Sequence, residues 1–101
     1  MIVGQMVKEP SEEITVAVDF TNEVVDLETI DSAVVTSKND ATLLDSSASF
    51  LSIVPHEITS PIVAKRCRGG SHGQTHIVQI TATTSLGNVY EAEVEVMVAE
   101  S

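Results

Sequence analysis

The sequence contains one cysteine, no tryptophan, one tyrosine and two phenylalanines among its 101 residues. A lone cysteine, Cys67, cannot form a disulfide within the chain, so the fold must be stable without one. With so few aromatic side chains, valine, isoleucine, leucine and alanine have to fill the core. The N-terminus has neither a basic start nor a long apolar run, so we predict no secretory signal. Because no apolar run is long enough to cross a bilayer, we also expect no membrane partner.

Basic residues are scarce as well. Lysine and arginine together number 5 against 15 aspartates and glutamates, which gives a formal net charge of -10 at pH 7. Such a charge argues against binding to a nucleic-acid backbone, and it mainly favours solubility. The hydrophobic content of 43% is enough for a core. At this length we expect one domain over residues 1–101, with residues 1–9 forming an N-terminal arm or a first strand.

The clearest pattern lies in the C-terminal third, where two runs alternate apolar and polar residues. Apolar residues occupy the even positions of both runs, and this period of two is typical of strands with one buried face. Between the runs lies Ser85-Leu86-Gly87, a loop length whose last residue is left-handed and favours glycine. We therefore predict a hairpin with strands at about 74–84 and 88–98.

The loop length also predicts the register of this hairpin. On the buried face the expected pairs are Ala82 with Tyr90, Ile80 with Ala92 and Val78 with Val94. On the other face they are Thr81 with Glu91, Gln79 with Glu93 and Ile77 with Glu95. A shift of one residue would turn the three glutamates into the core, so the register is well specified.

Shorter strands with turns between them are predicted along the rest of the chain. Apolar residues and turn signals place these strands at 2–7, 14–20, 30–37, 41–44, 50–54 and 62–67. In the third of them we expect Ala33, Val34 and Val35 to be buried from both sides, and we place a helical turn at Val24, Val25 and Leu27. Seven or eight strands favour an all-β fold, an immunoglobulin-like antiparallel β-sandwich. A small closed barrel is the alternative.

Several segments resemble a family of small bacteriophage virion proteins with an immunoglobulin-like fold, some of which are fibre–tail adaptors. The segments are Lys8-Glu9-Pro10 leading into residues 13–20, residues 27–32, Gly69-Gly70-Ser71-His72-Gly73, and Thr83-Thr84-Ser85-Leu86-Gly87 before a glutamate-rich last strand. The resemblance covers nearly the whole chain. It implies a non-enzymatic structural protein of the phage particle, assembled in the host cytoplasm, that acts in the neck or tail region between the tail or collar and the fibres. The implied partners are copies of the chain and other virion proteins.

Cys67, His72 and His76 have the residue types of a metal site. A structural zinc site usually takes four ligands, and no second cysteine is present, so we predict neither a metal nor another cofactor. His76 is instead interpreted as a core histidine bonded to a loop carbonyl, or as a substitute for the tyrosine-corner hydrogen bond of such sandwiches. A calcium site at Asp26, Glu28 and Asp31 is less favoured because the spacing differs from that of an EF-hand loop.

Two sets of charged residues are the candidate protein-interface residues. Lys65, Arg66 and Arg68 lie beside a Gly-Gly loop that lacks the spacing of a phosphate-binding loop. Glu91, Glu93 and Glu95 share one face of the last strand, and we interpret them as a charged edge that blocks unwanted strand pairing. We expect the basic set on one copy to contact the acidic set on the next in a homo-oligomer.

Two other functions compete with this interpretation. A carbohydrate- or ligand-binding sandwich module would need an exposed aromatic platform, and the only tyrosine, Tyr90, is predicted to point inward. A small hydrolase would need a convergent set of titrating residues, which the sequence does not indicate.

Overall fold

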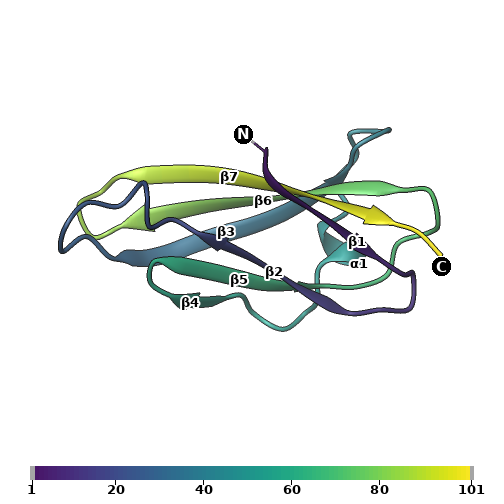
Figure 1. Cartoon of the computed structure of the whole chain (residues 1–101), viewed down its shortest axis with the longest axis horizontal. Helices are drawn as coiled ribbons and strands as arrows, with labels where there is room; N and C mark the ends of the chain where they lie inside the picture. Colours follow the sequence, from purple (N-terminus) through teal and green to yellow (C-terminus); the bar gives the residue numbers. More distant parts are fainter. Residues whose placement is uncertain (1, 101) are drawn as a thin grey trace.

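Seven strands in the described part of the chain form two sheets that pack face to face (Figure 1). The structure is a computed structural model that describes residues 2–100; Met1 and Ser101, the ends of the predicted domain, lie outside the described residues. The strands are β1 (Ile2–Lys8), β2 (Ile14–Asp19), β3 (Ile30–Asn39), β4 (Glu57–Thr59), β5 (Ile62–Cys67), β6 (Thr75–Thr84) and β7 (Val89–Val98), and the one short helix is α1 (Ser47–Phe50). The predicted all-β sandwich is confirmed.

The larger sheet has the strand order β1-β7-β6-β3 and the smaller sheet the order β2-β5-β4. Most neighbours are antiparallel, as predicted, but β1 pairs with β7 in parallel. The chain then crosses to the other sheet through a turn at Pro10 and Ser11, where proline cannot continue a ladder. The predicted N-terminal arm or first strand is therefore a strand.

The C-terminal hairpin has the predicted loop and register. Ala82 pairs with Tyr90, Ile80 with Ala92 and Val78 with Val94, and each glutamate of the last strand lies opposite the expected residue of β6. In the loop, the amide of Gly87 donates to the carbonyl of Thr84 at 3.0 Å, and Gly87 has φ +80°. The strands predicted at 14–20 and 62–67 are also present, at Ile14–Asp19 and Ile62–Cys67.

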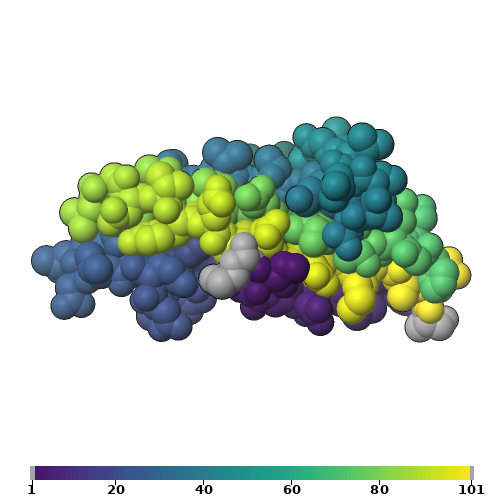
Figure 2. All heavy atoms as spheres, turned by 90° about the horizontal axis from the view of Figure 1, so that it is seen from above, coloured from purple at the N-terminus to yellow at the C-terminus, as the bar shows by residue number. Residues whose placement is uncertain are grey.

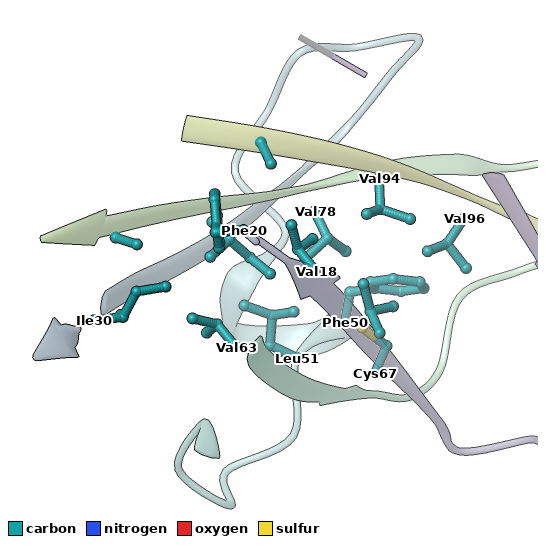
Figure 3. Packing of buried hydrophobic residues seen from close by; sticks show 14 of the residues in the cluster. Val18, Phe20, Ile30, Phe50, Leu51, Val63, Cys67, Val78, Val94 and Val96 are labelled. Carbon is teal, nitrogen blue, oxygen red and sulfur yellow. The ribbon is translucent and has the colours of Figure 1, made fainter. Parts of the chain in front are cut away.

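Aliphatic side chains from both sheets fill the core, as the scarcity of aromatic residues requires (Figure 3). Phe50, at the end of α1, lies fully buried between the sheets, and its ring stacks on the imidazole of His76 with 4.0 Å between ring centroids. The fully buried members of this core also include Val16, Val63, Cys67, Val78, Ile80, Ala82 and Val96. The short helix therefore contributes the largest apolar side chain at this end of the sandwich.

The segment between β3 and β5 differs most from the prediction. The strand predicted at 41–44 is wrong, because the chain turns back there: the amide of Leu43 donates to the carbonyl of Asn39 at 2.8 Å, and the Oδ1 atom of Asn39 accepts from Ala41. The strand predicted at 50–54 is wrong as well, since Phe50 belongs to α1 and only Leu51 forms a bridge, to Cys67. The three-residue strand β4 was not predicted.

Two predictions about apolar residues are also wrong. Val34 is 63% exposed, because it points to the uncovered outer face of the larger sheet and only the alternate residues Ala33 and Val35 pack against the core. Val24, Val25 and Leu27 form no helical turn; the loop carries turns instead, and Leu27 is 99% exposed with φ +68°.

We expect Gly87→Val to destabilise the protein by about 1 kcal/mol or more, because a β-branched side chain disfavours positive φ. An added Cβ at Gly87 meets no atom within 4 Å, so backbone strain is the only cost. Gly4→Val is the matched control: the site is equally open, but its φ is not positive. Thermal melting of both variants tests this prediction, and equal midpoints for the parent and Gly87→Val would contradict it.

Candidate protein-interaction site

A buried carboxylate, that of Glu28, fixes one end of the sandwich. It accepts hydrogen bonds from the hydroxyl of Thr84, from the side-chain amide of Asn88 at 2.8 Å, from the hydroxyl of Tyr90 at 3.2 Å and from the amide of Val25 at 2.9 Å. These bonds, led by that from Thr84, hold the pKa of Glu28 at about 2. The carboxylate thereby joins the loop before β3 to the β6–β7 hairpin.

These bonds bear on two sequence-based hypotheses. Both oxygens of Glu28 already accept hydrogen bonds, and Asp31 accepts one from Thr29 at 2.9 Å. Two of the three suggested calcium ligands, Glu28 and Asp31, are thus engaged within the protein. Tyr90 is partly buried and packs against the core with its hydroxyl held by Glu28, so its ring is not an open platform for a sugar.

Figure 2 shows the loop before β3, in dark blue, and the yellow-green hairpin turn at the same end of the molecule. Each displays an apolar side chain: Leu27 is 99% exposed and Leu86 is 62% exposed. Because Glu28 and Thr29 are bonded to the hairpin, these side chains project from an ordered end.

A buried lysine, Lys8, fixes the other end of the sandwich. Its ammonium donates to the carbonyls of Glu9 at 2.8 Å, Gly69 at 2.5 Å and Pro10 at 3.3 Å, and it lies 5.9 Å from the centroid of the Phe50 ring. Burial lowers the pKa of Lys8. The burial of Lys8 was not predicted, although the period of two in β1 places Met6 and Lys8 on one face and could have indicated it.

His76 is a buried histidine opposite Val96, as predicted. Its Nδ1 atom lies 2.9 Å from the hydroxyl of Ser46 and its Nε2 atom 3.1 Å from Oε1 of Gln74. Gln74 lies in the loop before β6, so the predicted bond to a loop carbonyl is present, through a side-chain amide. The tyrosine-corner substitute is wrong, because both partners are side chains and that corner bonds to the backbone. Burial lowers the pKa of this imidazole.

The other two residues of the suggested metal site serve different purposes. Cys67 is buried in the core, and burial raises the pKa of its thiol to about 11. His72 accepts a hydrogen bond from the amide of Glu100 at 3.0 Å. Within residues 2–100, no group of three or more histidine, cysteine, aspartate or glutamate side chains is arranged to hold a metal ion.

The basic candidates lie on and beside β5, the central strand of the smaller sheet. Lys65 lies opposite the buried Val16, and its ammonium donates to the carbonyl of Val54 at 2.7 Å. Arg66 points to the opposite face of the sheet and forms an ion pair with Glu13 at 3.2 Å, with both side chains nearly half exposed. Arg68 follows the strand, and its amide donates to the carbonyl of Phe50 at 2.7 Å.

The acidic candidates Glu91, Glu93 and Glu95 lie on the outer face of the larger sheet. The prediction that they guard a free edge is wrong for Glu93 and Glu95, because β7 is paired there on both sides, with β1 and β6. Glu91 precedes the stretch that pairs with β1. Glu95 accepts a hydrogen bond from Gln5 of β1 at 3.2 Å. Glu91 borders a hollow between the sheets that is also lined by Val3, Ala17, Val18, Asp19, Phe20, Glu23 and Ala92.

A sequence model of one protein family, described as "Podophage GP4 fiber-tail adaptor protein gp77", matches residues 8–97. The chain belongs to this fibre-tail adaptor family. The adaptor is accordingly a component of the phage virion, and its family supports a structural role. No curated protein is significantly similar to it.

The matched region begins at Lys8, so most of β1 precedes it. The match includes the adaptor's two fixed ends, with Lys8 at one and Glu28 at the other. In residues 2–100 of the adaptor, no helix is both long and apolar enough to cross a membrane.

We expect the adaptor to lose stability as the pH falls from about 4.5 to about 2, partly through Glu28. Its pKa is lowered from 4.5 to about 2 in the folded protein, so its contribution is complete above 4.5 and disappears as the pH falls through 2. Glu28→Gln should melt at a lower temperature than the parent at pH 7, and the difference between them should shrink on acidification. Glu91→Gln, at an exposed site, is the control. A constant difference between parent and Glu28→Gln across this range would refute the assignment.

Proposed function

We propose that this adaptor is a non-enzymatic structural protein of the neck or tail region, which joins the tail or collar to the fibres through protein–protein contacts. The observation that carries the proposal is the family match over residues 8–97. Three buried titratable groups support it, because they hold the fold: Glu28 fixes the hairpin end, Lys8 fixes the other end, and His76 packs on Phe50.

We further propose that the whole chain is one domain of immunoglobulin-like topology. With the strands lettered A to G in chain order, the two sheets read A-G-F-C and B-E-D. Immunoglobulin sandwiches likewise divide their strands between a sheet with B, E and D and one with C, F and G. In the adaptor, strand A (β1) extends the sheet that contains C, F and G, where it pairs with G (β7).

The two charged sets are the proposed contact surfaces for neighbouring virion proteins. Glu91, Glu93 and Glu95 lie on the outer face of the larger sheet, whereas Arg66 projects from the outer face of the smaller one. These faces point away from each other, so they cannot meet within one copy. An adaptor with two such faces can hold an acidic and a basic neighbour at the same time.

Imaging of intact particles tests the structural role. Particles of a phage that lacks this gene should differ from those of the parent in the neck, tail or fibres, and supplying the gene from a plasmid should restore them. Identical particles in the deletion mutant and the parent would reject the role, and the ligand-binding module would then be the better interpretation.

Charge reversal tests the acidic surface. We expect Glu91→Lys to lower the amount of adaptor in particles by a few-fold, since exposed ion pairs contribute about 0.2–1 kcal/mol each. Asp40→Lys, which makes the same change in an exposed loop away from the row, should not. Quantitative immunoblots of purified particles measure the effect, and equal incorporation of the two variants would exclude Glu91 from the contact.

A further inference from the structure

The larger sheet ends in two strands, β1 and β3, whose outer edges pair with no strand in the described part of the chain. Natural proteins usually protect such edges with charged residues, prolines or bulges. Each strand has a register irregularity near its start, between Ile2 and Gly4 in β1 and between Ile30 and Ser32 in β3. The regular stretches that follow, Gly4–Val7 and Ser32–Ser37, contain no charged residue, no proline and no further irregularity. The sheet therefore carries two unprotected stretches of edge, each able to accept a further strand.

Hydrogen bonds at one end of β3 show which residues face outward. The amide of Asn39 donates to the carbonyl of Leu44, and that of Ser37 to the hydroxyl of Ser47, so both point away from β6. Because this direction alternates along a strand, the amides and carbonyls of Ala33 and Val35 also point outward. Their side chains pack against the core and are only partly buried.

The same reasoning applies to β1. The carbonyl of Lys8 accepts from the amide of Ala99, which follows β7, so Lys8 and the alternate residue Met6 face β7. The backbone groups of Gln5 and Val7 then point to the free side. The side chains of these two residues are exposed, whereas Met6 packs against the core.

We propose that β1 of one adaptor copy adds to β3 of the next copy as a parallel strand, so that the larger sheets join edge to edge. This inference rests on the proposed function as a virion adaptor. Within one copy β1 and β3 run in the same direction, since β1 is parallel to β7 and β3 is antiparallel to β6. Copies repeated around an axis along the strands keep that direction, so their pairing is parallel.

The side chains agree with parallel pairing. In a parallel ladder, a residue that directs its backbone groups at the partner lies level with a residue whose groups point away. Met6 would thus lie level with Ala33 or with Val35, which places core-facing side chains side by side. Antiparallel pairing would place Ala33 level with Gln5 or Val7, and so set a core-facing side chain beside a solvent-facing one.

Other copies of the adaptor can pair with both free edges, that of β1 and that of β3. A two-fold dimer through β3 would cover that edge and leave both copies of β1 open. A head-to-tail contact instead covers β1 and β3 of every copy, and it closes into a ring when the rotation between copies allows. The ammonium of Lys8, bonded to three carbonyls, holds the end of β1 in place before the neighbour arrives.

Cysteine cross-linking in intact particles tests the pairing. Val34 and Val7 are 63% and 62% exposed. In two registers of the parallel pair, Ala33 and Val35 of β3 and Gln5 and Val7 of β1 all take part in the hydrogen bonds between the strands. One of these registers places Val34 level with Val7, and the other places it level with Gln5. Phage carrying Val7→Cys with Val34→Cys, and phage carrying Gln5→Cys with Val34→Cys, are oxidised and dissolved without reductant. In one of them the adaptor should form a ladder of multimers, because each copy links to two neighbours.

The single variants are the controls and should remain monomeric. The buried Cys67 should add no link in the parent. A dimer from Val34→Cys alone would indicate the two-fold contact and overturn the proposal, as would adaptor-containing particles without a ladder in either double variant. Particles that contain no adaptor even in the parent would instead reject the proposed function itself.

A second pair of variants tests the backbone of β3. Ala33→Pro removes an outward amide that no strand of the same copy uses, whereas Ala33→Ser keeps it. Both purified variants should fold, but incorporation of Ala33→Pro into particles should fall roughly fivefold or more relative to Ala33→Ser, as expected for one lost hydrogen bond. Equal incorporation of a folded Ala33→Pro would overturn the proposal; should that variant fail to fold, the cross-linking result decides.

Discussion

The pairing of β6 with β7 determines the position of every other strand in the larger sheet. It turns Val78, Ile80, Val94 and Val96 toward the core and the three glutamates of β7 toward solvent. The free side of β7 then receives β1, and the free side of β6 receives β3. A shift of one residue would place carboxylates between the sheets, and the cost of burying them keeps this register unique.

Strict alternation is what made the hairpin and β2 predictable from sequence, whereas β5 was located by the proline before it, Pro61. In the hairpin the buried and exposed residues alternate, so the pattern, the loop length and the register follow from one another. The region 41–54 could not be predicted in the same way, because its structure depends on distant partners. Phe50 belongs to the short helix α1 and fills the end of the core beside His76. The turn earlier in this region is stabilised by the side chain of Asn39, which accepts a hydrogen bond from the amide of Ala41.

The burial of Glu28 and Lys8, which hold the two ends of the sandwich, was not predicted from sequence patterns either, because it depends on distant partners. Glu28 lies in an acidic, irregular loop, and only the folded chain brings Thr84, Asn88 and Tyr90 to it. Lys8 is buried because three carbonyls converge on its ammonium, one of them 61 residues away in sequence. The charged candidates were identifiable as residues, but the sheet topology was needed to show that Arg66 and the glutamate row lie on opposite outer faces and that Lys65 lies on the core side of β5.

The parallel pairing of β1 with β7 also has a consequence for how the chain folds. β1 pairs with β7 from the far end of the domain's sequence, as the contact of Gln5 with Glu95, 90 residues apart, illustrates. Such long-range contacts slow folding, because the chain must close a large loop before the bonds form. Until β7 has been made, β1 lacks its partner and its mostly apolar stretch Ile2–Val7 is exposed to aggregation.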